Sequence, residues 1–140
     1  MKIDHVGIAV RKLDEHIATW QKALGVAGSP PEIVESQRVR VSFLEVGESH
    51  LELLEPTTPD SPIAKFLEKR GEGIHHVALE VSNLTETLHH LKETGVRLID
   101  EKPRKGARGR LVAFAHPSSF GSVLTELVQV DASGFEPEAS

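Results

Sequence analysis

The chain has 140 residues, of which 39% are hydrophobic, and its formal net charge is -5. This length suits one domain with a buried core, and the acidic balance argues against a general nucleic-acid-binding protein. Cysteine is absent, so disulfides, thiolate catalysis and sulfur-ligated metal sites are excluded. The apolar runs are too short to span a membrane and the N-terminus lacks the features of a signal peptide, so we expect a cytoplasmic protein without a membrane partner.

The first half of the chain predicts a strand, a helix and then further strands. "DHVGIAV" at 4–10 is the strand, and apolar residues spaced by three or four positions predict a helix before Gly25. Its expected buried face consists of Leu13, Ile17, Trp20 and Leu24. The stretches 38–47 and 49–56 predict two more strands. Residues 59–71 predict a short helical linker, with Asp60 or Ser61 as N-cap and Pro62 at the first helical position.

The second half repeats this order. "HHVALEV" at 75–81 predicts a strand, and a helix follows it with Leu84, Leu88 and Leu91 on one face. Residues 96–100 are a candidate strand, 102–110 form a basic loop, and two strands follow at 111–117 and 122–130. The polar residues 132–140 are expected to be a disordered tail.

An internal repeat relates the two halves. Six pairs of like residues, beginning with His5 and His76, are separated by 71 positions, and "LEL" at 51–53 corresponds to "TEL" at 125–127. We therefore predict an α+β fold in which two βαβββ modules, about 1–58 and 72–131, pack as one domain spanning 1–131.

The repeat also predicts a metal site. Each half supplies a histidine early in its first strand and a glutamate in its last, and a twofold arrangement would bring His5, Glu52, His76 and Glu126 together. Two imidazoles and two carboxylates suit a divalent ion such as Co, Mn, Ni or Zn, which this ligand set does not distinguish. Either glutamate alone is better explained as a solvent-facing residue of an antiparallel sheet. The repeated histidines favour the metal site.

Other histidines are weaker candidates. The repeat selects His76, so His75 is expected to point to the opposite face. His50 shares a face with Glu52 and is a reserve ligand. In the basic loop, Arg104 and Lys105 are candidate contacts for an anionic substrate, although a solvated turn explains the loop equally well.

The doubled layout with His, Glu, His and Glu resembles the vicinal oxygen chelate superfamily, which includes glyoxalase I, extradiol dioxygenases and antibiotic-resistance proteins. Within it, "SPIAKFL" leading into "GIHHVALEV", together with "KPRKGARG" and "VLTELVQ", is similar to the methylmalonyl-CoA epimerases. The resemblance covers roughly residues 3–130. It implies an open, cupped mixed sheet, a homodimer, and a divalent metal ion held by the four residues named above.

The resemblance further implies an isomerase that interconverts (2R)- and (2S)-methylmalonyl-CoA. Moving the proton from one face of the α-carbon to the other passes through an enolate, which a divalent cation stabilises, and it needs acid/base groups. Glu126 is the predicted catalytic residue, and the basic loop would contact coenzyme A. The alternatives are a glyoxalase I-type lyase and a binding protein without catalysis.

Two positions depart from the epimerase pattern. Val41 stands where some epimerases have a glutamate, which leaves the second acid/base group unassigned. Ser118 stands where lysine is common, so the affinity for coenzyme A or the choice of acyl group is expected to differ.

Overall fold

The computed structural model describes residues 1–131, so the expected tail at 132–140 lies outside the described residues. The elements of the first half are β1 Lys2–Ala9, α1 Leu13–Leu24, β2 Glu32–Val34, β3 Val39–Val46 and β4 Ser49–Pro56. The elements of the second half are β5 Gly73–Glu80, α3 Leu84–Glu93, β6 Arg104–Lys105, β7 Leu111–Ala115 and β8 Thr125–Gln129. Helix α2, Pro62–Arg70, connects the halves.

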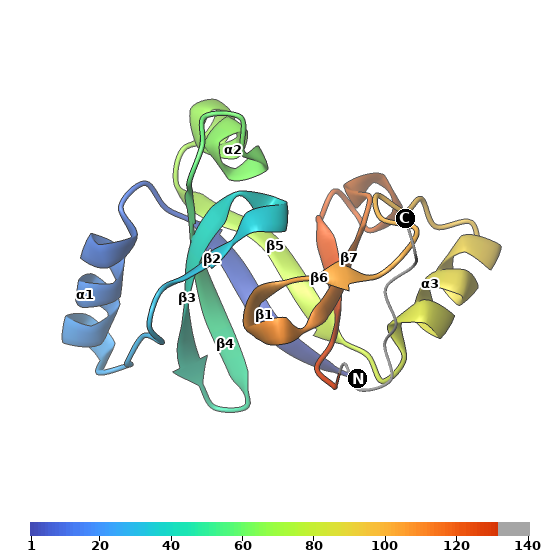
Figure 1. Cartoon of the computed structure of the whole chain (residues 1–140), viewed down its shortest axis with the longest axis horizontal. Helices are drawn as coiled ribbons and strands as arrows, with labels where there is room; N and C mark the ends of the chain where they lie inside the picture. The colour runs from blue at the N-terminus through green and yellow to red at the C-terminus, as the bar shows by residue number, and fades with distance from the viewer. Residues whose placement is uncertain (132–140) are drawn as a thin grey trace.

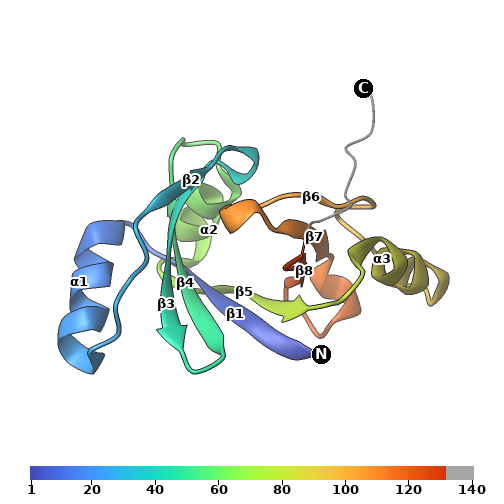
Figure 2. The same ribbon diagram turned by 60° about the horizontal axis from the view of Figure 1, so that its bottom comes forward.

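All eight strands belong to one curled sheet with the order β2-β3-β4-β1-β5-β8-β7-β6. Strands β1 and β5 are antiparallel at its centre, and each has the last strand of its own half as a parallel neighbour. The strands of the first half, counted from one edge, therefore follow the same order as the corresponding strands of the second half counted from the other edge (Figure 2). This confirms the predicted α+β fold built from two βαβββ modules that form an open mixed sheet.

Helices α1 and α3 lie at opposite ends of the molecule, outside the sheet (Figure 1). Leu13 of α1 packs on Leu53 of β4, and Leu84 and Leu88 of α3 pack on Leu127 of β8. Because neighbouring strand residues point to opposite faces, Glu52 and Glu126 point to the other face. We call this other face, which carries both glutamates, the inner face of the sheet.

The helices begin where side chains of the sheet satisfy their first amide groups. The Leu13 amide of α1 donates to the Glu55 carboxylate of β4, and the Leu84 amide of α3 donates to the Gln129 side chain of β8. These positions correspond in the two modules. Helix α2 begins at Ser61, whose hydroxyl accepts from the amide of Ile63, which decides between the two predicted N-caps. Helices α1 and α3 are thus tied to strands at the end that has free amides, whereas α2 is capped by its own Ser61.

The structure corrects three details of the sequence-based reading. Leu24 was expected on the buried face of α1, but it is 67% exposed because it lies in the last turn. Residues 96–100 form only an isolated bridge, between Leu98 and Ala115. The edge strand β6 lies instead inside the predicted basic loop. Within residues 1–131, no helix is long and apolar enough to cross a membrane.

Candidate metal centre

The four predicted ligands meet on the inner face of the sheet. One donor atom from each of His5, Glu52, His76 and Glu126 lies within 4.8 Å of the other three. They come from four adjacent strands, β4, β1, β5 and β8. All four side chains are buried, with at most 5% of any residue exposed. The twofold arrangement expected from the repeat is therefore what brings these residues together.

The separations of the donor atoms match those around a single divalent ion. The His5 Nε2 atom lies 2.8 Å from Glu126 Oε1 and 3.3 Å from Glu52 Oε1. The His76 Nε2 atom lies 3.3 Å and 3.4 Å from the same two oxygens. Metal–ligand distances of about 2.1 Å place adjacent ligands of a tetrahedral or octahedral ion roughly 3.0–3.4 Å apart.

The local contacts also call for a cation. The two Nε2 atoms lie 3.1 Å apart, so without a cation or a proton between them their lone pairs would repel. Glu126 Oε1 is buried and has no hydrogen bond of acceptable geometry, even though it is 2.8 Å from His5. A buried carboxylate oxygen without a partner is unfavourable. The donor set therefore fits a divalent ion such as Co, Mn, Ni or Zn.

Close packing across β1 and β5 positions the two imidazole rings. Gly7 lies opposite His76 in the β1–β5 pair, and His5 lies opposite Ala78. A Cβ atom added to Gly7 would lie 2.1 Å from Cε1 of His76, well inside van der Waals contact. Glycine at position 7 therefore makes the room that the His76 ring occupies.

Behind His5 lies a buried carboxylate. Asp4 is 1% exposed, and its Oδ2 atom accepts a hydrogen bond from His5 Nδ1 at 2.7 Å. Both of its oxygens also accept from one guanidinium nitrogen of Arg110, at 2.8 Å and 2.7 Å. This arrangement keeps the proton of the His5 ring on Nδ1 and leaves Nε2 directed at the glutamates, as expected for the outer partner of a metal-bound histidine.

Behind His76 lies a second histidine instead. His75 Nδ1 is 2.9 Å from His76 Nδ1, and the His75 ring packs edge-on against Phe66 of α2. The expectation that His75 points away from the site is therefore wrong, because its ring turns toward α2 and back onto His76. His76 Nδ1 can donate to a neutral His75, which again leaves Nε2 for the metal.

The electrostatics agree with a site built for positive charge. Burial acts to lower the pKa of His5, but Glu52, Asp4 and Glu126 outweigh it and raise this pKa to about 12. The pKa of His76 is also raised, because both glutamates outweigh its burial. Burial acts to raise the pKa of Glu52 and of Glu126, yet the two histidines hold both below the usual value. The carboxylates are thus ionised and attract either protons or a cation.

Aromatic rings extend the twofold arrangement beyond the ligands. Phe43 lies edge-on to His5 with ring centres 5.8 Å apart, and Phe114 lies edge-on to His76 at 5.6 Å. In the sheet, Phe43 is paired with Glu52 and Phe114 with Glu126. Positions 43 and 114 have the same 71-residue separation as the histidines, so the repeat was the signal that could have found them.

The basic loop reaches both rings. The guanidinium of Arg108 lies 3.9 Å from the centre of the Phe43 ring, and that of Arg104 lies 5.7 Å from the centre of the Phe114 ring. Arg104 is already engaged, by Asp100 at 3.4 Å and by the Ser36 carbonyl. Lys105 is exposed, and its carbonyl accepts from the Ser36 hydroxyl. Arg104 and Lys105 remain predictions as substrate contacts.

Val41 and His50 also lie on the inner face. Val41 is 1% exposed and packs with Ala9 and Leu54 in an apolar cluster, so no carboxylate occupies that position. His50 is not among the four converging ligands, and its ring packs edge-on against Phe43 at 6.0 Å. Burial lowers its pKa, which favours a neutral ring.

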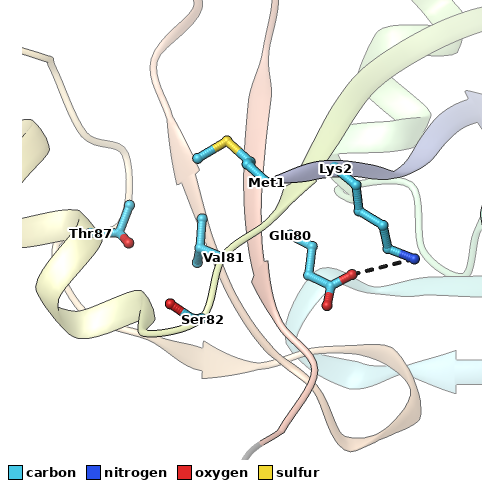
Figure 3. A pocket seen from close by; sticks show the side chains of 6 residues that line it. All are labelled: Met1, Lys2, Glu80, Val81, Ser82 and Thr87. Atoms are coloured by element: carbon cyan, nitrogen blue, oxygen red, sulfur yellow. Dashed lines mark ion pairs between the residues drawn. The ribbon is translucent and has the colours of Figure 1, made fainter.

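A separate pocket lies away from these residues, between the start of β1, the end of β5 and α3 (Figure 3). Its volume is about 570 Å³, and its lining includes Val81, Ser82 and Thr87. The ion pair drawn there joins Lys2 and Glu80 at 3.6 Å and is partly exposed. The lining residues include none of the four predicted ligands, and its two charged side chains, Lys2 and Glu80, are paired with each other.

Comparisons with known proteins agree with this geometry. The chain is 43% identical over 128 residues to the uncharacterized protein YqjC of Bacillus subtilis, covering 91% of each chain. It is 40% identical to the mitochondrial methylmalonyl-CoA epimerase of Bos taurus, covering 91% of this chain and 74% of that one.

Similarity extends to solved structures. A variant of the Streptomyces coelicolor methylmalonyl-CoA epimerase, solved in complex with 2-nitronate-propionyl-CoA, superimposes with a TM-score of 0.90 at 36% identity, over 98% of this chain and 99% of that one. The resemblance inferred from sequence motifs is thereby confirmed. Residues 4–114 match the sequence profile of the glyoxalase/bleomycin resistance protein/dioxygenase superfamily, and the chain belongs to that superfamily.

Proposed function

We propose that this protein is a metal-dependent epimerase that interconverts (2R)- and (2S)-methylmalonyl-CoA by 1,1-proton transfer. The observation that carries the proposal is the buried convergence of His5, Glu52, His76 and Glu126 within 4.8 Å. The proposal is also supported by the similarity, over most of the chain, to proteins named methylmalonyl-CoA epimerase. Four such ligands suit a catalytic ion with open coordination positions.

The reaction needs an acidified α-proton and a base. A divalent ion bound by the four ligands supplies positive charge that stabilises an enolate of the thioester. Glu126 supplies one acid/base group, because the two histidines hold its pKa low and its carboxylate is therefore ionised. The ionised Glu126 carboxylate would accept the α-proton on one face of the α-carbon, and delivery of a proton to the opposite face requires a second acid/base group, which Val41 leaves unassigned.

Apolar side chains lie beside the site of the proposed proton transfer. Val112 and Val128, which lie on the inner face of β7 and β8, pack with Ala78 of β5. Phe114 covers His76 from one side. A low-polarity surround strengthens the interaction between a cation and a developing negative charge.

Deuterium exchange tests the proposed function directly. Metal-loaded protein in deuterated solvent is expected to exchange the α-proton of methylmalonyl-CoA, and Glu126→Ala is expected to lose both metal retention and exchange. Glu126→Gln keeps an oxygen ligand and removes the base, so it is expected to retain more metal than Glu126→Ala while losing exchange. Normal exchange by Glu126→Ala would contradict the assignment of this residue.

Val41 favours a second candidate, a glyoxalase I-type lyase. An apolar residue at this position leaves Glu126 as the assigned base, and moving a proton between two neighbouring carbons of a hemithioacetal needs only one base. The same preparation is therefore assayed with methylglyoxal and a low-molecular-weight thiol. Turnover there without exchange of methylmalonyl-CoA would select the lyase.

The partners and the metal remain part of the proposal. We infer an acyl-CoA substrate and a homodimer; the homodimer is what the resemblance to the epimerases implies. Analytical ultracentrifugation of the metal-loaded protein tests the dimer. Elemental analysis after dialysis tests the cation, and a protein that binds no divalent ion would favour the third alternative, a binding protein without catalysis.

A further inference from the structure

The basic loop places two arginines beside the metal centre in unequal situations. Arg104 and Arg108 each lie over a phenylalanine that contacts a histidine ligand. The guanidinium of Arg104 is engaged by Asp100 and the Ser36 carbonyl. In the part of the chain that the structure describes, no carboxylate or carbonyl oxygen accepts a hydrogen bond from the guanidinium of Arg108. This group is therefore available to a ligand.

The backbone of Arg108 is held firmly, although within residues 1–131 no oxygen accepts a hydrogen bond from its guanidinium. Its φ angle is 57°, a left-handed conformation that non-glycine residues seldom adopt. Its amide donates to both carboxylate oxygens of Glu32 at 3.1 Å, which secures the turn to β2. Ala107, the preceding residue, packs against the apolar cluster that contains Val41 and Phe43. A strained conformation held by its surroundings is typical of functional positions.

The charges around the centre leave Arg108 uncompensated. Glu52 and Glu126 together balance a divalent ion, and Asp4 binds Arg110 through both oxygens. Glu32 contacts the amide of Arg108 and not its guanidinium. Burial and the nearby charge of Arg110 lower the pKa of Arg108, which agrees with a cation that lacks a close counter-ion, though an arginine stays charged. A bound anion would complete the balance.

Resting on the proposed function, we propose that the guanidinium of Arg108 binds the free carboxylate of the acyl group and so selects malonyl-type thioesters over simple acyl thioesters. The position supports a carboxylate over a coenzyme A phosphate. Arg108 and His5 contact the same Phe43 ring, whereas the phosphates of coenzyme A lie at the far end of the pantetheine arm. Guanidinium groups bind carboxylates with paired hydrogen bonds.

Binding measurements on the metal-loaded protein test this role without turnover. Wild-type protein is expected to bind methylmalonyl-CoA more tightly than propionyl-CoA, which lacks the carboxylate. Arg108→Gln is expected to weaken methylmalonyl-CoA binding by about 10- to 100-fold and leave propionyl-CoA nearly unchanged. Arg108→Lys is expected to recover part of the preference, which a merely structural role would not predict. Metal content is measured for every variant.

The matched control is Arg70→Gln, because Arg70 is another exposed arginine over a phenylalanine, Phe66, at 5.8 Å. It is expected to keep the preference for the carboxylate. If Arg108→Gln keeps the preference as well, the proposal is overturned. Arg108→Gln is expected to weaken, to the same degree, the binding of a truncated methylmalonyl thioester of N-acetylcysteamine, which has no phosphates. An effect confined to the CoA ester would assign Arg108 to a phosphate and would also overturn the proposal.

Failure of the proposed function has a different signature. Wild-type protein would then prefer methylmalonyl-CoA over propionyl-CoA and lose this preference in Arg108→Gln, yet exchange no α-proton. That result would support carboxylate binding by Arg108 in a protein of another activity.

Discussion

The two halves of the sheet present the same groups to the metal centre but support them differently. His5 with Phe43 and His76 with Phe114 have matching surroundings on the inner face. Behind His5 lies a charged carboxylate, whereas behind His76 lies a neutral imidazole. A divalent ion would require the same donor atoms from both halves, which explains why these are alike. The outer partners need only accept a hydrogen bond from Nδ1, and here the halves differ.

A second difference concerns space. His5 crosses Ala78, while His76 crosses Gly7, where a Cβ atom has no room. The two rings therefore have different neighbours across the β1–β5 pair. The duplicated halves give an approximate twofold symmetry, and a single methyl group, present at Ala78 and absent at Gly7, breaks it here.

The largest expected effect on metal affinity comes from replacing Gly7 with alanine, the residue at the matching position 78. Gly7→Ala forces the His76 ring to move, because the added Cβ would lie 2.1 Å from its Cε1 atom. Displacing a ligand should reduce metal affinity by more than the ~100-fold that loss of an outer partner can cost. Overpacking should also destabilise the fold by ~1–3 kcal/mol.

Calorimetric titration with Co²⁺ or Zn²⁺ measures this effect. The control is Ala78→Gly at the matching position, which removes a methyl group and is expected to keep the metal. Unchanged metal affinity in Gly7→Ala would show that the His76 ring can bind the ion from a second position, and it would contradict the role given to Gly7.

Part of the loss of stability between pH 6.5 and about 4 should come from His75, in the second half of the chain. In the metal-free protein, burial and the charge of His76 lower the pKa of His75 from 6.5 to about 4. Below pH 6.5 the unfolded chain takes up a proton that the folded chain does not take until about pH 4. The contribution of His75 is therefore full above pH 6.5 and is lost as the pH falls toward 4.

This loss amounts to at most ~3 kcal/mol. Urea unfolding of metal-free wild type and His75→Asn, at pH values above and inside this window, measures it. The variant is expected to lose less stability on acidification. An equal loss in both proteins would assign the effect to other groups.

The outer partner of His5 should matter more for metal binding than that of His76. Asp4→Asn removes the negative charge that His5 Nδ1 and Arg110 share, so we expect metal affinity to fall ~10- to 100-fold. His75→Asn replaces one neutral acceptor by another, so a smaller fall is expected. Competition with a chromophoric chelator gives both values, and the reverse order would contradict the comparison.

The smallest expected effects concern the starts of the two outer helices. Lys12, before α1, makes no side-chain cap, so the Leu13 amide depends on Glu55. Helix α3 has both Gln129 and its own N-cap, Asn83. Glu55→Ala should therefore cost ~1–2 kcal/mol and Gln129→Ala less, within the range for N-cap losses. Thermal unfolding of the two variants compares them.

Much of the fold was predictable because its pattern is duplicated. The strand, helix and strand order of each half follows from apolar spacing, and the shared separation of His5 and His76 pointed to one common site. The edge strand β6 was missed because Arg104 and Lys105 show no apolar alternation. The turn of His75 toward His76 was missed because strand periodicity alone predicts the opposite face.

Local pattern, with one repeat, was sufficient to predict the modules, the outer helices and which four residues share a face. Only the folded chain decided that Asp4 supports His5, that Gly7 gives His76 its space, and that, within residues 1–131, no oxygen accepts from the Arg108 guanidinium whereas Arg104 is engaged. The reason is physical. Periodicity records which face of an element is buried, whereas contacts between residues distant in the chain, such as Asp4 and Arg110, arise when the strands pair and the loops close over them.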